Sequence, residues 1–237
     1  MRFAIAAATL ISACLPLLAS AQATCSSDGQ PRPVAVFERF ISADCEACWG
    51  ESNTPAPSAR SPALVLDWIV PTAAGDDAPL SAAATNDALA RLQALGRSAP
   101  ARSDVHIAAT EAPAPGRLRV AHGLPFNDYL GAAISLSPAR GGSQRVATPG
   151  PWTFHLLLVE SIPAGAEGTA VARNVVRNML QGSWDERNQL SKKEQYGWKE
   201  IRPMRIPEGA KPERLRMVGW LQDAQGRMVA AAQSACR

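Results

Sequence analysis

The sequence predicts an α/β domain in the N-terminal part of the chain, followed by a β-rich, sandwich-like half. Three observations carry this prediction. An apolar, strand-like segment at 34–40 runs into a turn that holds Cys45 and Cys48. Residues 80–96 have apolar side chains at helical spacing, and from residue 117 onward the hydrophobic pattern repeats every second residue. We therefore expect one domain at 24–112 and an antiparallel β-rich domain at 113–237.

Length, composition and charge limit the class of protein. The chain has 237 residues, of which 46% are hydrophobic and 19% charged. A chain of this composition can bury a core and does not belong to the disordered class. Its formal charge of +3 is small and evenly spread along the sequence. This charge argues against nucleic acid or an anionic membrane as a partner.

The first residues have the pattern of a signal peptide. Arg2 gives a basic start, residues 3–18 are mostly apolar, and small residues suitable for cleavage follow. The apolar stretch is short for a membrane span and contains Pro16. A lipoprotein-type box ending at Cys14 is the alternative, but the small-residue site after it fits better. We expect cleavage of residues 1–23, no membrane span, and a periplasmic or secreted protein.

The cysteines follow from that expectation. Cys25, Cys45, Cys48 and Cys236 remain after cleavage, and an even number in an oxidising compartment suggests two disulfides with three alternative connectivities. We favour Cys45–Cys48 and Cys25–Cys236. The second bond would close a very long loop and stabilise the fold by roughly 4–5 kcal/mol. Zinc is the competing interpretation, but no further ligand lies near the pair at metal spacing, so we expect no metal and no other cofactor.

The N-terminal elements are predicted in chain order. Segment 34–40 alternates and carries Glu38 on one face and Arg39 on the other, so each charge needs an edge position or a partner. Prolines after Cys48 prevent a long helix there. Residues 63–70 form an apolar strand, and residues 80–96 a helix that Gly96 ends.

The remaining segments have the character of strands. A residue pattern of Asp, Ala, Gln and Gly at 223–226 predicts a hairpin turn near the C-terminus. The strands are expected at 105–109, 117–121, 132–136, 152–161, 169–182, 198–206, 215–222 and 227–232.

Three segments resemble a known group of proteins. Residues 38–48 (Glu-Arg-Phe-Ile-Ser-Ala-Asp-Cys-Glu-Ala-Cys) are similar to the N-terminal motif of secreted thioredoxin-like proteins of unknown function from proteobacteria, which reads Glu-Leu-Phe-Thr-Ser-x-Gly-Cys-x-x-Cys-Pro-Pro. Asp67-Trp68 and 174–177 (Asn-Val-Val-Arg) are similar to later stretches of that family, in the same order. The resemblance implies a thioredoxin-like fold, reduced or divergent, in residues 24–112. The reaction of the family is unassigned.

The chain departs from that family at defined positions. Asp44 stands where the family has Gly, and Trp49-Gly50 stand where it has Pro-Pro. A Tyr-Thr-Pro segment, which would place a cis proline opposite the dithiol, is absent from the sequence. The resemblance therefore implies a scaffold more than an activity.

Cys45, Cys48 and Glu38 are the candidate catalytic residues. In a redox dithiol, Cys45 attacks a partner's disulfide, Cys48 resolves the mixed disulfide, and Glu38 accepts the proton of Cys48. In the alternative, Cys45–Cys48 is a permanent disulfide and Glu38 forms a salt bridge. Asp44 and Glu46 disfavour a thiolate between them. The sequence leaves two functions open: thiol–disulfide exchange on exported proteins, or a non-enzymatic binding or assembly module with two structural disulfides.

Other conspicuous side chains receive ordinary interpretations. His106, His122 and His155 have no Ser or Cys at a motif spacing and are interpreted as strand residues. Trp49 and Trp68 are interpreted as packing partners of the dithiol region, with an apolar rim for a peptide as the alternative.

Overall fold

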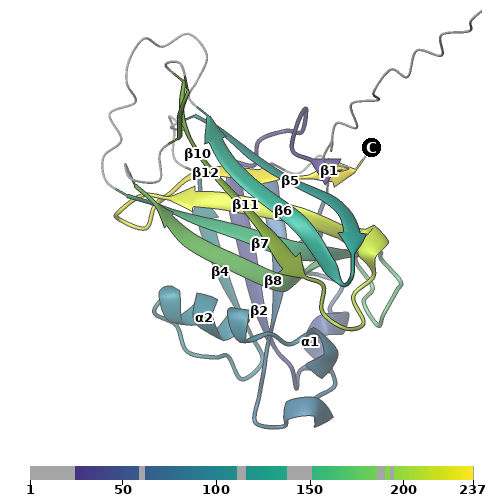
Figure 1. The fold of residues 1–237 in the computed structure, drawn as a ribbon. Helices are drawn as coiled ribbons and strands as arrows, with labels where there is room; N and C mark the ends of the chain where they lie inside the picture. The colour runs from purple at the N-terminus through teal and green to yellow at the C-terminus, as the bar shows by residue number, and fades with distance from the viewer. Residues whose placement is uncertain are drawn as a thin grey trace, which may run out of the picture.

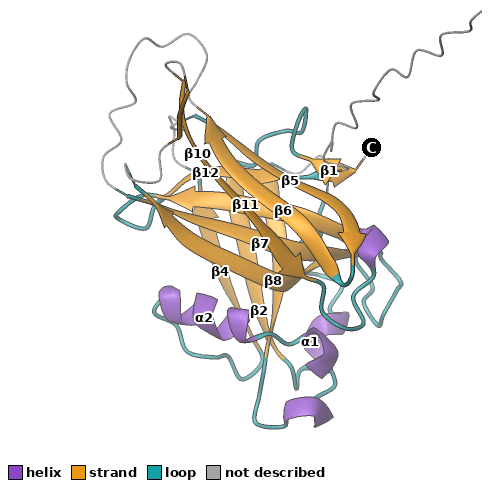
Figure 2. Cartoon of the chain, in the orientation of Figure 1, coloured by secondary structure: helices purple, strands orange, loops and turns teal. Residues whose placement is uncertain are grey.

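The fold consists mainly of strands arranged in two sheets (Figures 1 and 2). The computed structural model describes residues 25–58, 62–110, 116–137, 151–185, 190–192 and 195–236. The expected signal peptide at 1–23, including Cys14, lies outside the described residues. Within the described part of the chain, no helix is long and apolar enough to cross a membrane.

The smaller sheet has six strands in the order β13-β1-β5-β6-β10-β9. All of its pairs are antiparallel. Its strands are β1 (Cys25–Ser26), β5 (Arg117–Phe126), β6 (Tyr129–Ser137), β9 (Leu190–Lys192), β10 (Gln195–Arg205) and β13 (Ala235–Cys236).

The larger sheet has seven strands in the order β12-β11-β7-β8-β3-β2-β4. Two of its pairs, β2 with β3 and β3 with β8, are parallel. Its strands are β2 (Ala35–Ser42), β3 (Ala63–Val70), β4 (Ser103–Ala109), β7 (Trp152–Ile162), β8 (Arg173–Trp184), β11 (Leu215–Gln222) and β12 (Met228–Gln233).

Helices are few and short. The α-helices of the described residues are α1 (Glu46–Gly50) and α2 (Asn86–Ala94). Single 3-10 turns occur at η1 (Gly75–Asp77), η2 (Ser81–Ala83) and η4 (Pro212–Arg214). The helix predicted at 80–96 is confirmed only in its second part, because Thr85 caps α2 by accepting a hydrogen bond from the Ala88 backbone N–H.

The predicted fold class, an α/β thioredoxin-like N-terminal domain with a β-rich half, is wrong. A parallel β2–β3 unit with the dithiol between its strands is present. It lies inside a largely antiparallel sheet, however, and two short helices do not form the helical layers of an α/β fold. The physical reason is visible after α1, which ends at Gly50: the prolines at 55 and 57 disfavour a further helix, and none occurs among the described residues before β3.

The larger sheet combines strands from both sides of the boundary expected at 112/113. Asp67 of β3 pairs with Val175 of β8, across more than a hundred residues of chain. β4 precedes the boundary and belongs to the larger sheet, whereas β5 follows it and belongs to the smaller one. Residues 24–112 and 113–237 therefore share one sheet.

The predicted strand positions are confirmed almost throughout. Segments 63–70 and 215–222 match β3 and β11 residue for residue, and the hairpin turn at 223–226 connects β11 to β12. The other predicted segments overlap strands whose ends differ by a few residues; β8, for example, begins at Arg173 and not at 169. The short strands β1, β9 and β13 are not among the predicted ones. Alternation of apolar and polar side chains is a local property, and this explains why the sequence located the strands so well.

The main core fills the space between the two sheets. It contains Val120 of β5, Ile134 of β6 and Leu158 of β7, all fully buried. At Gly219 of β11 the layers approach closely, since an added Cβ would lie 2.8 Å from a side-chain carbon of Val120. The sheets pack face to face, as in a sandwich.

The two helices lie at the same end of the molecule, on opposite faces of the larger sheet (Figure 1). Leu92 of α2 packs with Phe40 of β2, whereas Cys48 of α1 packs with Ile41 of β2. Because neighbouring residues of a strand point to opposite faces, this alternation places α1 and α2 on different sides.

Candidate thiol–disulfide site

Both expected disulfides are present. Cys25 and Cys236 join β1 to β13, and Cys45 and Cys48 are joined across the first turn of α1. The structure thus confirms the favoured connectivity among the three that the sequence allowed.

The Cys45–Cys48 bond lies where β2 passes into α1. Cys45 is the N-cap residue, and its carbonyl accepts hydrogen bonds from the backbone N–H groups of Cys48 at 3.0 Å and Trp49 at 3.3 Å. Cys45 is 7% exposed, whereas Cys48 is completely buried. Asp44 and Glu46 beside Cys45 are exposed to solvent. Both cysteines are therefore buried, and Cys45 is the less completely buried of the two.

Two buried arginines hold the C-terminal end of α1. Arg39 of β2 extends its Nη1 to the Cys48 carbonyl at 3.4 Å. Arg173 of β8 donates through Nη2 to the carbonyls of Trp49 at 3.2 Å and Glu51 at 2.6 Å. The last carbonyls of a helix have no partner within the helix, so these guanidinium groups provide the missing donors. They anchor a helix that is too short to be stable alone.

Asp67 of β3 completes this buried set of charges. Arg39 donates from Nε to Asp67 Oδ1 at 2.7 Å, and both side chains are buried. Burial raises the pKa of Asp67, although the positive charges of Arg39 and Arg173 oppose that effect. Arg39 Nη2 and Asp67 Oδ2 have no hydrogen-bond partner among the described residues. The guanidinium groups of Arg39 and Arg173 outnumber the single carboxyl group of Asp67, so the buried set beneath α1 carries net positive charge.

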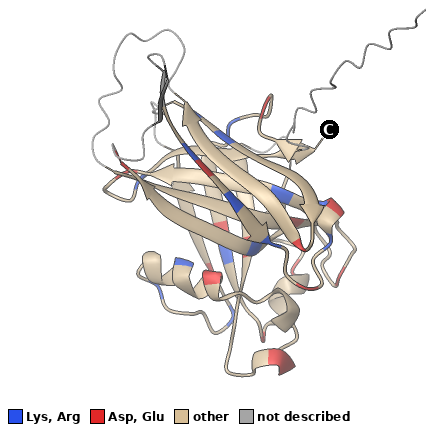
Figure 3. Ribbon diagram, in the orientation of Figure 1, with Lys and Arg blue, Asp and Glu red and all other residues tan. Residues whose placement is uncertain are grey.

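Acidic residues occur in the turn at the start of α1 and in η1, at the same end of the molecule (Figure 3). Asp76 and Asp77 of η1 are exposed, as are Asp44 and Glu46. The Leu80 backbone N–H donates to the Ala43 carbonyl at 3.1 Å, which brings the segment after η1 against the start of the dithiol turn. A thiolate at Cys45 would thus lie between buried positive charge and exposed negative charge.

Trp49 packs in the dithiol region, as interpreted from the sequence, whereas that interpretation is wrong for Trp68. Trp49 is buried and donates from Nε1 to the Glu167 carbonyl at 2.6 Å, and the Arg173 guanidinium lies 5.8 Å from its ring centroid. Trp68 is completely buried and lies on the opposite face of the larger sheet, in the cluster with α2. Neither side chain forms an exposed rim.

The structure does not bring Glu38 to the dithiol. Its carboxylate accepts two hydrogen bonds from Arg91 of α2, at 2.9 and 2.6 Å, and one from Trp68 Nε1 at 3.1 Å. Glu38 alternates with Arg39 along β2 and therefore points to the α2 face, away from Cys48. The expected proton transfer between Glu38 and Cys48 has no geometric basis. Glu38 does form a salt bridge, but its partner Arg91 is buried and β2 is an interior strand, whereas the sequence suggested a surface arginine at a sheet edge.

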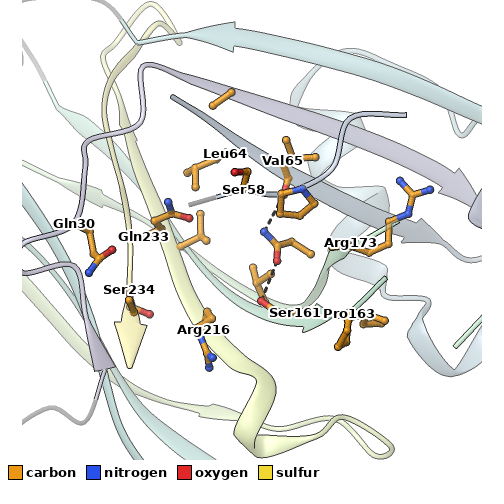
Figure 4. Close-up of a pocket in the computed structure, with 18 residues that line it drawn as sticks. Gln30, Ser58, Leu64, Val65, Ser161, Pro163, Arg173, Arg216, Gln233 and Ser234 are labelled. Carbon is orange, nitrogen blue, oxygen red and sulfur yellow. Dashed lines mark hydrogen bonds between the residues drawn. The ribbon is translucent and has the colours of Figure 1, made fainter. Parts of the chain in front are cut away.

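A separate cavity of about 340 Å³ opens beside β3, β7, β8 and β11 (Figure 4). Asn174 lines the cavity and connects two of its strands: its side-chain amide donates to the Val65 carbonyl at 3.2 Å and accepts from Ser161 Oγ at 3.0 Å. Arg216 also lines the cavity and donates from Nη1 to the Leu215 carbonyl at 2.7 Å. The lining combines apolar strand residues with a few polar groups, as small-molecule sites do.

Sequence patterns do not identify Arg39, Asp67 and Arg173 as site residues. The sequence feature that could have indicated them is a charged side chain inside an otherwise apolar strand, because a charged residue is buried only when it has a partner. The sequence shows that Glu38 and Arg39 need partners, but not which residues supply them.

Comparison with known proteins adds no family. No protein-family model matches the chain, and no curated protein sequence matches it either.

Proposed function

We propose that this protein exchanges thiols and disulfides with exported proteins in an oxidising compartment, through Cys45 and Cys48. The observation that carries the proposal is the unequal burial of the pair. Cys45 retains exposed surface at the start of α1, and Cys48 retains none. An exchange reaction needs one accessible sulfur for the partner and one protected sulfur that closes the intramolecular bond.

The reaction can be followed from the disulfide state. A partner thiolate attacks Cys45 Sγ, the Cys45–Cys48 bond breaks, and Cys48 leaves as a thiolate. A second partner thiolate then attacks the partner sulfur of the mixed disulfide and releases Cys45. Two electrons pass from the partner to Cys45 and Cys48, and the partner gains a disulfide. In the reverse sequence, Cys45 attacks a partner disulfide and Cys48 resolves it.

The buried charges beneath α1 support this chemistry. Arg39 and Arg173 reach the carbonyls of the dithiol helix, and only Asp67 opposes their charge from within the buried set. Nearby positive charge stabilises a thiolate and therefore the reduced state of the pair. This effect counteracts Asp44 and Glu46, which disfavour the thiolate from the solvent side.

The decisive experiment is the reduction potential of the Cys45–Cys48 pair. The protein is equilibrated in glutathione buffers and alkylated, and mass spectrometry of peptides assigns each disulfide separately. A potential between roughly −120 and −270 mV is expected of an exchange protein. A potential below about −300 mV, with Cys45 unreactive in the folded protein, would contradict the proposal.

A matched pair of variants gives a second test. Cys48→Ala leaves the more exposed Cys45 as a free thiol and should accumulate mixed disulfides with partner proteins. Cys45→Ala leaves only the buried Cys48 and should accumulate none. Equal trapping by both variants would mean that the difference in burial does not direct the reaction.

A non-enzymatic binding module, with both disulfides structural, is the second candidate function. The 340 Å³ cavity beside Asn174 favours it, because that volume lies at the lower end of the range for small-molecule sites. A very low potential of the Cys45–Cys48 pair would support this candidate over the first.

A further inference from the structure

A second group of side chains lies at the opposite disulfide. Cys236 of β13, Cys25 of β1 and His122 of β5 are directly paired neighbours across three adjacent strands. Directly paired residues of neighbouring strands point to the same face of a sheet. A ring nitrogen of His122 and the two sulfurs all lie within 4.8 Å of one another. Three ligands suited to a soft or borderline metal therefore lie close together, and once the bond between the two sulfurs is reduced they can separate to bind one cation.

The hydrogen bonding of His122 resembles that of a metal-binding histidine. His122 Nδ1 lies 2.8 Å from the carbonyl oxygen of Gly123, a distance at which Nδ1–H donates and Nε2 keeps its lone pair. Histidines that bind metals typically donate their other ring N–H to a backbone carbonyl in this manner. Nε2 is buried and has no hydrogen-bond partner among the described residues, and His122 as a whole is only 5% exposed. A buried polar atom without a partner is costly, and a ligand would satisfy it.

The surroundings of His122 disfavour its protonated form. Burial lowers the pKa of His122, and the positive charge of Arg216 lowers it further, while the nearby carbonyls of Gly123 and Leu215 oppose this. Neutral imidazole is the form that binds metals.

Access to the group differs between its two cysteines. Cys25 is buried, whereas Cys236 is exposed next to the end of the chain. Reagents from solvent can therefore reach the disulfide through Cys236. β1 and β13 are only two residues long, so little backbone pairing holds the chain ends once the covalent bond is broken.

We propose that Cys25, Cys236 and His122 form a redox-controlled site for a zinc-class divalent cation, occupied when the Cys25–Cys236 bond is reduced. Two molecules of a small thiol such as glutathione convert the bond into two cysteine thiols and leave as one disulfide. The cation then replaces both thiol protons, which pass to the buffer, and takes the lone pair of His122. Solvent fills the fourth tetrahedral position. Cation binding thus replaces the disulfide as the connection between β1, β5 and β13.

Cobalt provides the direct test, because tetrahedral Co²⁺ with thiolate ligands absorbs in the visible and near-ultraviolet. Full-length protein carrying Cys14→Ser, Cys45→Ala and Cys48→Ala contains Cys25 and Cys236 as its remaining cysteines. After reduction with a phosphine, anaerobic titration should show one Co²⁺ per chain with sulfur-to-cobalt charge transfer, and Zn²⁺ should displace it. The oxidised protein should bind no Co²⁺ at this site.

Matched variants identify the ligands. His122→Gln should weaken Co²⁺ binding by at least about tenfold. His106→Gln should leave it unchanged, because His106 lies in β4 of the other sheet. Cys236→Ser should reduce the charge-transfer intensity. Circular dichroism establishes that each reduced variant is folded. If the triple variant does not fold, the titration is repeated on reduced protein that has all its native cysteines. In that protein, His122→Gln should bind one equivalent of Co²⁺ less than the unsubstituted chain.

Absence of cobalt bands in folded, reduced protein would overturn the proposal. Binding that is unaffected by His122→Gln would overturn it as well. The result is independent of the exchange chemistry proposed for Cys45 and Cys48, since the test protein lacks that pair.

Discussion

Arg39 Nε donates a hydrogen bond of 2.7 Å to Asp67 Oδ1 in the interior of the larger sheet, on the face that α1 covers. The pair is incompletely satisfied, because Arg39 Nη2 and Asp67 Oδ2 have no partner among the described residues. A buried ion pair is costly to break but not costly to replace by apolar side chains. The contact therefore serves to position α1, through the Arg39–Cys48 hydrogen bond, more than to stabilise the fold.

This interpretation predicts a specific double-mutant cycle. Arg39→Met should lower the free energy of unfolding by about 3–5 kcal/mol, because Asp67 is left as an unpaired buried carboxyl. Adding Asp67→Leu to Arg39→Met should recover part of that loss. Urea unfolding of the unsubstituted protein, the two single variants and the double variant gives the coupling free energy between Arg39 and Asp67.

An exposed ion pair supplies the control for that cycle. Arg97 and Asp104 lie partly in solvent, with side chains 35% and 40% exposed. Arg97→Met should change the free energy of unfolding by no more than about 1 kcal/mol. A loss at Arg39 as small as the loss at Arg97 would contradict a buried positioning role.

The two disulfides should differ in their contribution to stability. Cys25 and Cys236 are 211 residues apart in sequence, whereas Cys45 and Cys48 are three apart. In the chain-entropy model, removing the long-range bond by Cys25→Ser/Cys236→Ser costs roughly 4–5 kcal/mol. Removing the short one by Cys45→Ser/Cys48→Ser costs about 2 kcal/mol. Thermal and urea unfolding of both double variants would test the order, and the reverse order would count against unfolded-state entropy as the cause.

Acid should destabilise the protein through His155. This residue is buried, its Nε2 lies 2.7 Å from Gln222 Oε1, and burial lowers its pKa to about 3. The unfolded chain binds a proton at His155 near its ordinary pKa of 6.5, but the folded chain does not until about 3. Stability from this residue is therefore complete above pH 6.5 and is lost as the pH falls toward 3.

The size of this effect can be measured. Between about pH 7 and about pH 4.5, the neutral His155 should account for roughly 2.5 kcal/mol of lost stability. His155→Phe removes the titrating group and should make the urea midpoint less dependent on pH over this range. The slope that remains belongs to other groups, including His106 and His122, whose pKa values burial also lowers. An unchanged slope in His155→Phe would exclude His155 as the cause.

Close packing between the sheets should make Gly219 sensitive to substitution. A Cβ at this position would lie 2.8 Å from a Val120 side-chain carbon and 3.0 Å from the His155 carbonyl oxygen. Gly219→Ala should therefore destabilise the protein by about 1–3 kcal/mol.

Gly131 of β6 is the matched control, because a Cβ added there would meet no described atom within 4 Å and the φ of Gly131 is not positive. Gly131→Ala should be neutral within about 0.5 kcal/mol. Thermal unfolding of both variants would compare them. Equal melting temperatures would show that the sheets adjust to the added methyl group at Gly219.

The dithiol shows how far sequence patterns reach. The position of Cys45 and Cys48 after a strand, and the bond between them, follow from spacing alone and are confirmed. The catalytic role expected for Glu38 is wrong, because Glu38 does not lie near the dithiol. Alternation along β2 shows that Glu38 and Arg39 lie on opposite faces of the sheet, but it does not show which helix covers each face. Arg91, which pairs with Glu38, comes from a helix about fifty residues later.

The second disulfide shows the same limit. The sequence favours Cys25–Cys236, and it indicates no more than an ordinary strand residue at His122. Only the pairing of β1 with both β5 and β13 places the imidazole beside the two sulfurs. No spacing in the sequence indicates this, because His122 is about a hundred positions from either cysteine and the two cysteines are 211 residues apart.

By itself, the sequence determined most of the strands and the hairpin turn after β11, since these depend on local side-chain alternation and turn chemistry. It favoured the observed connectivity of the four cysteines among three alternatives. The tertiary structure decided which strands share a sheet. The predicted α/β fold class is wrong, because the described residues form mainly two sheets and β3 pairs with β8, a strand of the other half. Such pairing depends on the fit of faces brought together by folding, and hydrophobic periodicity within one segment contains no information about its distant partner.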